Sequence, residues 1–208
     1  MGIRTRRKRL EHFEQRADAF DLALMEGVEG VDHRHVERDK DIIVGSGQHR
    51  RLMMKRSPRH LEFVGRDYEI LLDYYQKKGV KPKHYALERV KFSENTGVME
   101  YFNTPSVDEL NNYLKLREVE KERGKPFTLP EAIDAAGEFD LTRDEWFICK
   151  RFSKQNPGIT LEKLGNAFDE LHGHIRESIG SDVNIVGSNI LVLGQMKDGK
   201  IKLAIVDV

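Results

Sequence analysis

The sequence has very little cysteine and no long hydrophobic run. Cys149 is the only cysteine among 208 residues, so an intramolecular disulfide is excluded and a reducing compartment suits the chain. No run approaches the roughly 18 apolar residues that a membrane span needs, and no secretory signal pattern is present. A myristoylation motif also fails, because Arg6 stands where Ser or Thr is required. We therefore expect a cytoplasmic protein that does not span a membrane.

An excess of charge of either sign is also missing. Lys plus Arg and Asp plus Glu each number 35, which gives a formal net charge of zero. The bulk charge therefore gives no reason to expect acidic partners, and nucleic acid is not an expected partner. A chain of 208 residues can form one domain or two small lobes around a real hydrophobic core.

The N-terminus combines a basic cluster with an amphipathic pattern. Apolar residues recur at spacings of three and four, which predicts a helix with the stripe Leu10, Phe13, Ala17, Phe20 and Leu24. This stripe must cover either the rest of the chain or a second copy, so a homodimer through this helix stays open. The cluster from Arg4 to Arg9 can reach phosphate groups, although a solvated tail is favoured.

The end of the sequence predicts a β-hairpin. An apolar run from Asn189 to Leu193 precedes the turn signal Asp198-Gly199, and an alternating strand follows it. Antiparallel pairing would bring Asn189 and Asp207 together at the open end. One amide oxygen and one carboxylate suit Mg²⁺ when phosphates supply its other ligands. The alternative is an ordinary surface hairpin, in which Asn and Asp are simply residues that favour turns.

This arrangement resembles the catalytic hairpin of protein-kinase-like phosphotransferases. In that family an H-R-D-x-x-x-x-N loop leads into a strand pair that ends at a metal-binding Asp. Here Asp182-Val-Asn-Ile-Val-Gly-Ser-Asn189 precedes the strand pair, which ends in Ile-Val-Asp207. Counting back five residues from Asn189 reaches Asn184, whereas Asp182 lies two residues earlier. The resemblance implies Mg²⁺ binding by Asn189 and Asp207, with Asp182 as the catalytic base in place of Asn184.

The first half of the chain adds to the resemblance. A hairpin from Asp41 to Arg56, turning at Gly45-Ser46-Gly47, would end with Lys55 in Leu-Met-Met-Lys, which resembles the phosphate-binding Lys of Val-Ala-Ile-Lys. A helix that starts at Ser57-Pro58 carries Glu69, which suits the family's Lys–Glu pair. The resemblance also asks for a glycine-rich loop over the phosphates, for which the candidates are Gly27 and Gly30.

A strand near residue 100 resembles the kinase hinge. Strands are predicted from His84 to Phe92 and from Gly97 to Phe102, and the second one reads Val-Met-Glu-Tyr-Phe. The resemblance implies that Met99 guards the adenine pocket and that the backbone of Glu100 and Phe102 reads adenine. The alternative is a core strand followed by a helix cap.

The second half predicts capped helices. Thr128-Leu-Pro-Glu131 and Thr142-Arg-Asp-Glu145 fit the capping-box pattern, and Thr160 caps a third helix. The first is expected to end at Gly137 and the second before Asn156-Pro157-Gly158. The third has an apolar face, and His172 and His174 near its end are expected to solvate the helix terminus rather than bind metal. The core candidates in the second helix and the apolar face of the third are Trp146, Phe147, Phe152, Leu161, Leu164, Phe168, Leu171 and Ile175.

Together these features predict an α+β, bilobal protein-kinase-like fold. Residues 1–26 would form the basic amphipathic helix, 27–102 a small antiparallel-sheet N-lobe, and 103–208 a reduced, mostly helical C-lobe. The expected function is an ATP- and Mg²⁺-dependent phosphotransferase whose phosphate acceptor the sequence does not identify. One alternative is a pseudokinase that binds a nucleotide or a protein partner. Another is a winged-helix nucleic-acid-binding protein, and a third is an assembly protein that dimerises through its N-terminal helix.

Overall fold

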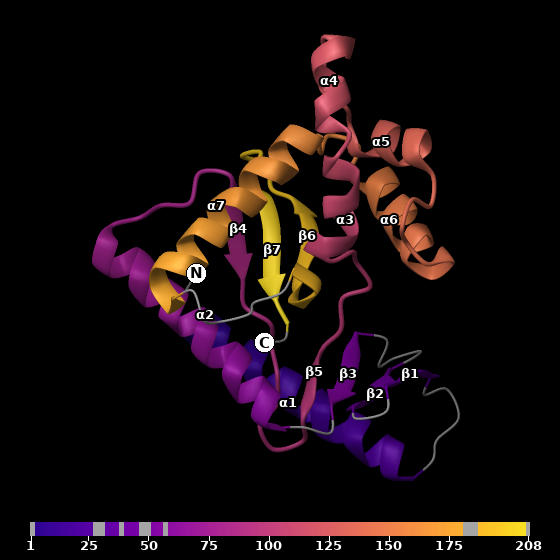
Figure 1. Ribbon diagram of the computed structural model, residues 1–208. Coiled ribbons are helices and arrows are strands. Elements are labelled where there is room, and N and C mark those ends of the chain that lie inside the picture. Colours follow the sequence, from indigo (N-terminus) through magenta and orange to yellow (C-terminus); the bar gives the residue numbers. More distant parts are fainter. Residues whose placement is uncertain are drawn as a thin grey trace. The chain divides into compact units, whose positions relative to one another are not determined.

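The computed structural model describes residues 3–26, 32–37, 40–45, 51–55, 58–180 and 187–206. Within these residues the chain is a mixed α+β protein with two small sheets (Figure 1). The contacts divide it into two compact units, each built from two segments of the sequence. Unit 1 comprises Met1–Phe63 and Val90–Phe102, and unit 2 comprises Val64–Arg89 and Asn103–Val208.

Unit 1 contains an antiparallel four-stranded sheet. Its strand order is β1-β2-β3-β5, and the backbone N–H of Gly45 donates to the carbonyl of Leu52 at 2.8 Å where β2 leads toward β3. The predicted antiparallel strand pair is therefore confirmed, while Ser46 and Gly47 of its predicted turn lie outside the described residues. The strands are β1 (Asp32–Glu37), β2 (Lys40–Val44), β3 (Leu52–Lys55) and β5 (Val98–Glu100).

Helix α1 (Ile3–Met25) covers one face of this sheet. Phe13, Ala17 and Phe20 are buried against Leu52 and Val98, as the spacing of the apolar stripe predicts. One expectation was wrong. The side chain of Leu10 is 51% exposed, because it lies outside the strip of α1 that meets the strands. The helix begins at Ile3, so the basic cluster belongs to α1, where the side chains of Lys8 and Arg9 are exposed.

Unit 2 contains a three-stranded sheet of order β4-β7-β6. Strands β6 (Ile190–Gln195) and β7 (Ile201–Ile205) are antiparallel, while β4 (Tyr85–Glu88) runs parallel to β7. The strand predicted from His84 to Phe92 is thus shorter than expected. Phe92 makes only an isolated bridge to Met99, so this segment contributes to both sheets.

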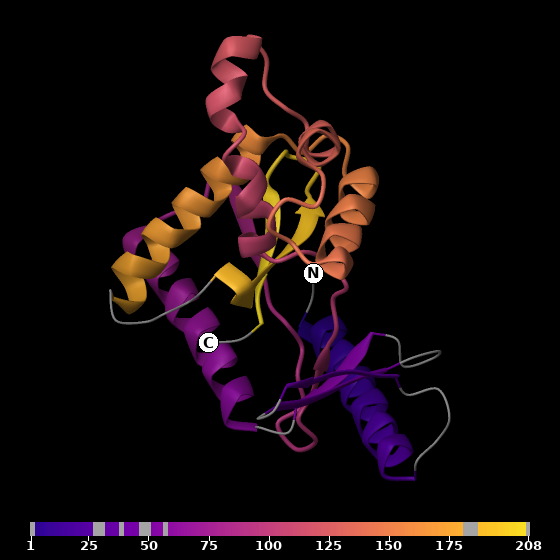
Figure 2. The same ribbon diagram turned by 45° about the vertical axis from the view of Figure 1, so that its right-hand side comes forward.

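Helices surround the sheet of unit 2, and Figures 1 and 2 show α3 and α7 lying side by side against it. Capping boxes start α3, α5 and α6, and the two that were predicted at Thr128 and Thr142 are confirmed. Thr160 caps α7 as expected. The helices are α2 (Pro58–Lys78, of which Val64 onward belongs to unit 2), α3 (Val107–Leu114), α4 (Arg117–Arg123), α5 (Leu129–Ala136), α6 (Arg143–Gln155) and α7 (Leu161–Ile179).

The core of unit 2 is formed by the apolar face of α7 and the inward side of β6 and β7. Phe152 of α6 is buried, but Phe147 is 48% exposed, so its predicted core position was wrong. The ring of Phe147 instead lies beside Trp146 and near the guanidinium of Arg143. Burial raises the pKa of the Cys149 thiol to about 12, which keeps it protonated and unreactive.

Candidate functional site

The closed end of the β6–β7 hairpin is the predicted Asp198-Gly199 turn. The backbone N–H of Gly199 donates to the carbonyl of Met196 at 3.0 Å, and that of Met196 donates to the carbonyl of Lys200 at 2.8 Å. Gly199 has φ +90°, a conformation that favours glycine. The carboxylate of Asp198 accepts from the N–H of Lys200 at 3.3 Å. This turn sets the register of the strand pair.

Asn189 lies at the open end of the hairpin. This residue ends a short 3₁₀ helix, η2 (Gly187–Asn189), and leads directly into β6. Its carbonyl oxygen accepts a hydrogen bond from the N–H of Val206 at 2.8 Å, next to the pairing of Ile190 with Ile205. The start of β6 and the end of β7 therefore lie together here, as the hairpin pattern predicts. Asp207 is the next residue in the sequence and lies outside the described residues.

Helix α3 holds η2 in place. Gly187 is buried, and a Cβ atom at this position would lie 2.1 Å from Oδ1 of Asp108 and 3.3 Å from its backbone nitrogen. Only glycine can allow the start of α3 to approach so closely without a shift. Asn189 is thus positioned by packing against α3 as well as by its pairing with Val206.

The segment that follows β5 is anchored to the same hairpin. The N–H of Val192 in β6 donates to the carbonyl of Pro105 at 2.8 Å, and Ser106 forms an antiparallel bridge with Leu191. Ser106 is also the N-cap of α3, where Glu109 completes the capping box. The loop between β5 and α3 is therefore fixed to β6 immediately after Asn189.

The residues predicted to act on the phosphates are described only in part. Lys55 is the last residue of β3, where its backbone pairs with Ile42, and its side chain lies outside the described part. Glu69 of α2 forms an ion pair with Arg89 at 3.1 Å, and both side chains are about half exposed. The other predicted residues Asp182, Asn184, Gly27 and Gly30 also lie outside the described residues.

The predicted hinge strand has two distinct faces. Met99 is only 1% exposed and pairs with Met53, while Val98 and Glu100 lie on the opposite face of β5. The N–H of Glu100 donates to the carbonyl of Lys91 at 2.9 Å. Phe102 follows β5 as the last residue of unit 1 and is partly buried.

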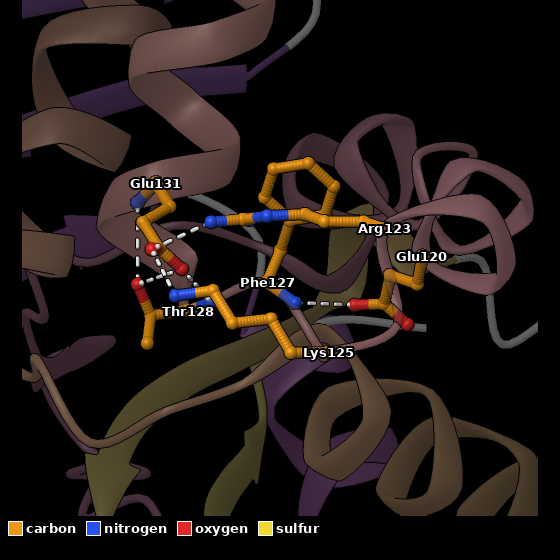
Figure 3. A network of polar contacts seen from close by, with 6 residues as sticks. All are labelled: Glu120, Arg123, Lys125, Phe127, Thr128 and Glu131. Atoms are coloured by element: carbon orange, nitrogen blue, oxygen red, sulfur yellow. Dashed lines mark hydrogen bonds and ion pairs between the residues drawn. The ribbon is translucent and has the colours of Figure 1, made fainter.

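A network of charged residues joins α4 to α5 (Figure 3). The carboxylate of Glu131 accepts from the N–H of Thr128 at 3.0 Å and from Arg123 at 2.9 Å, and Lys125 lies 3.3 Å away. These contacts, led by the Thr128 backbone hydrogen bond, lower the pKa of Glu131 to about 2. The guanidinium of Arg123 also lies 4.2 Å from the centre of the Phe127 ring. The capping box accounts for Glu131, so we interpret this network as structural.

A half-buried polar cluster in unit 2 was not predicted. The hydroxyl of Tyr85 lies 2.7 Å from Nδ1 of His174 and within hydrogen-bond distance of the Tyr75 hydroxyl. His172 is exposed as expected, whereas the expectation for His174 was wrong, because its half-buried ring contacts Tyr85 of β4. Burial raises the pKa of Tyr75 to about 12 and also raises that of Tyr85. Both phenols stay neutral near pH 7 and tie α2, β4 and α7 together.

Comparison with known proteins leaves function to be inferred from the residues themselves. No protein-family model, no curated protein and no solved structure matches the chain. In the part of the chain that the structure describes, no group of three or more His, Cys, Asp or Glu residues is placed to hold a metal ion. None of the described helices is long and apolar enough to cross a membrane.

Proposed function

We propose that the chain is a phosphotransferase of the protein-kinase-like class that uses ATP and Mg²⁺. The observation that carries the proposal is the hydrogen bond from Val206 N–H to the carbonyl of Asn189. It supports a site in which the Asn189 amide and the Asp207 carboxylate stand together at the open end of the hairpin. A hard-oxygen pair of this kind holds Mg²⁺ together with nucleotide phosphates.

The organisation of unit 1 gives further support. Its strand order β1-β2-β3-β5, with Phe92 bridging to the outer side of β5, suits the antiparallel N-lobe sheet expected of this class. Helix α2 follows β3, which also suits the class. Within unit 2, Pro105 and Ser106 are anchored to β6 of the hairpin that carries Asn189.

In this proposal unit 1 supplies groups that bind the nucleotide. Lys55 would contact the α- and β-phosphates, and the backbone at Gly27 and Gly30 would cover them. Met99 would pack beside adenine. Because the N–H of Glu100 already donates to Lys91, Glu100 would contact adenine through its carbonyl oxygen, with the backbone of Phe102 as the second contact.

Unit 2 supplies the groups that act on the phosphates. Asn189 and Asp207 would hold Mg²⁺, which neutralises phosphate charge as the phosphoryl group leaves. Asp182 would accept the proton of the acceptor, because Asn184 at the counted position cannot take a proton at neutral pH. Glu69 would orient Lys55. Positioning and charge neutralisation carry most of the catalysis in this class.

The winged-helix alternative has less support. Its recognition helix would be α7, which should then present a basic face to phosphates. Glu170 of α7 instead accepts hydrogen bonds from the N–H groups of Lys83 and His84 at 2.9 and 2.8 Å. Part of the polar face of α7 is therefore used to hold the start of β4.

Thermal unfolding with ATP and Mg²⁺ together, and with each alone, tests the proposal. A ligand that binds only the folded protein at about 100 times its Kd adds about 2.7 kcal/mol to the free energy of unfolding. For a chain of this length that corresponds to a rise in Tm of about 5–10 °C. The proposal predicts this rise only when both are present. No rise with millimolar ATP and either Mg²⁺ or Mn²⁺ would overturn it.

A further inference from the structure

Unit 1 carries a concave surface on which cationic side chains gather, here called the basic groove. It encloses about 480 Å³ and is open to solvent, and Phe13 and Leu52 form its apolar floor. Residues from α1, from the start of β3 and from the strand region around β5 line it. Its charged residues are Lys8, Arg9, Arg16, Arg51, Lys91 and Glu100. Five cations thus face one carboxylate in a chain whose formal net charge is zero.

Four of these cations have no ion pair among the described residues. No described carboxylate forms an ion pair with Lys8, Arg9, Arg51 or Lys91. Elsewhere many exposed cations are matched: the described pairs include Lys77–Asp73, Arg89–Glu69, Lys115–Asp140, Arg123–Glu131, Lys200–Asp198 and Lys202–Glu88. Lys8, Arg9, Arg51 and Lys91 lie in one groove and repel one another, and a bound anion would relieve this repulsion.

The groove is distinct from the proposed nucleotide site. Leu52, Val98 and Glu100 belong to the sheet face that α1 covers, and the groove opens on that face. Met99 and its partner Met53 belong to the opposite face. A ligand in the basic groove would therefore not contact the sheet face that carries Met99.

We infer that the basic groove binds the phosphodiester backbone of a nucleic acid without reading its sequence. Lys8, His12 and Arg16 recur every four residues, so they form a row about 12 Å long on α1. A duplex carries one phosphate charge per about 1.7 Å, so several phosphates lie along such a row. Phe13, the aromatic residue of the groove, is only 6% exposed and offers no stacking platform for bases.

Fluorescence anisotropy of the full chain with a labelled DNA duplex of about 20 base pairs tests the inference, with salt varied from about 50 to 200 mM. With three to five cations engaged, the plot of log K against log salt should have a slope of about −3 to −4.5. The variant Arg51→Gln/Lys91→Gln should reduce this slope by about 2 and weaken binding about 10–100-fold near 0.1 M salt. Both side chains are exposed, so the fold should tolerate the change.

The matched control is Lys154→Gln/Lys197→Gln, which removes the same charge from exposed positions of unit 2. It should bind the duplex within about twofold of wild type, because net charge alone does not create the site. Equal weakening by the two double variants would overturn the inference. So would the absence of duplex binding at about 50 mM salt.

A second arm uses inorganic tripolyphosphate and a duplex RNA of the same length. The inference predicts that DNA and RNA duplexes compete for one site, since both present the same backbone chemistry. Binding of tripolyphosphate without binding of either duplex would assign the groove to a small polyphosphate and overturn the nucleic-acid assignment. The result is distinguishable from ATP binding, because the substituted residues Arg51 and Lys91 have no role in the proposed nucleotide site.

Discussion

The backbone N–H of Val206 donates a hydrogen bond to the carbonyl oxygen of Asn189 across 2.8 Å. This contact joins residues that are far apart along the hairpin and ends the strand pair next to Asp207. The packing of η2 against α3 at Gly187 also fixes the position of Asn189. The proposed Mg²⁺ site depends on this convergence, and the following predictions test the residues around it.

Asp182→Asn tests whether the chain is an enzyme. If Asp182 is the base, phosphotransfer or ATP hydrolysis should fall about 10²–10⁴-fold in steady-state assays. ATP affinity should barely change, since the base acts on the acceptor. The control Asn184→Ala should keep most of the activity, because an amide cannot serve as the base. Turnover of Asp182→Asn at the wild-type rate would remove Asp182 as the base, and no turnover by the wild-type protein would favour the pseudokinase alternative.

Variants of Glu69 and Arg89 distinguish an effect on ATP binding from an effect on stability. Their ion pair is about half exposed, so removing either partner should lower the free energy of unfolding by less than about 1 kcal/mol. If Glu69 orients Lys55, Glu69→Gln should also weaken ATP binding about tenfold, or about 1.4 kcal/mol. Arg89→Gln should leave ATP affinity unchanged in the same calorimetric titration. Equal ATP affinities for the two variants would remove Glu69 from the site.

Gly187→Ala tests the packing that positions Asn189. Because the new Cβ would meet Asp108 at 2.1 Å, we expect a loss of about 1–3 kcal/mol in urea unfolding. Adding Asp108→Ala should recover part of that loss. The control Gly173→Ala places its Cβ in open space within α7 and should stabilise the protein by about 0.5–1 kcal/mol. A neutral Gly187→Ala would contradict the close approach.

Glu131 gives a prediction for pH. Its pKa is lowered from the ordinary 4.5 to about 2, so the folded protein gains stability from the ionised carboxylate above about pH 4.5. That contribution should be lost as the pH falls toward 2. Glu131→Gln should therefore differ most from wild type near pH 6 in urea unfolding, and the difference should shrink in acid. A difference that stays constant with pH would contradict the contacts to Thr128 and Arg123.

Local features of the fold could be predicted from the sequence. The Asp198-Gly199 turn and the capping boxes at Thr128 and Thr142 depend on residues only a few positions apart, and each formed as expected. The Asn189 end of the hairpin followed from the same local register. Short-range hydrogen bonds leave a recognisable residue pattern, which is why they could be anticipated.

Long-range contacts could not be predicted in the same way. The parallel pairing of β4 with β7 joins residues more than a hundred positions apart, and no sequence pattern near Tyr85 predicts it. The contact of His174 with Tyr85 depends on that pairing. The basic groove likewise forms only because α1 lies beside Arg51 and Lys91. The formal net charge of zero gave no indication that cations gather there.

The most direct test of the central claim is isothermal titration of ATP, with Mg²⁺ present, into Asp207→Ala and Asp198→Ala. Both variants remove one Asp near the same hairpin, and Asp198 stands at the closed end, where it contacts Lys200. The proposed site predicts that Asp207→Ala loses Mg²⁺-dependent ATP binding while Asp198→Ala binds as wild type does. Unchanged Mg²⁺-dependent ATP binding by a folded Asp207→Ala protein would contradict the metal site at the open end.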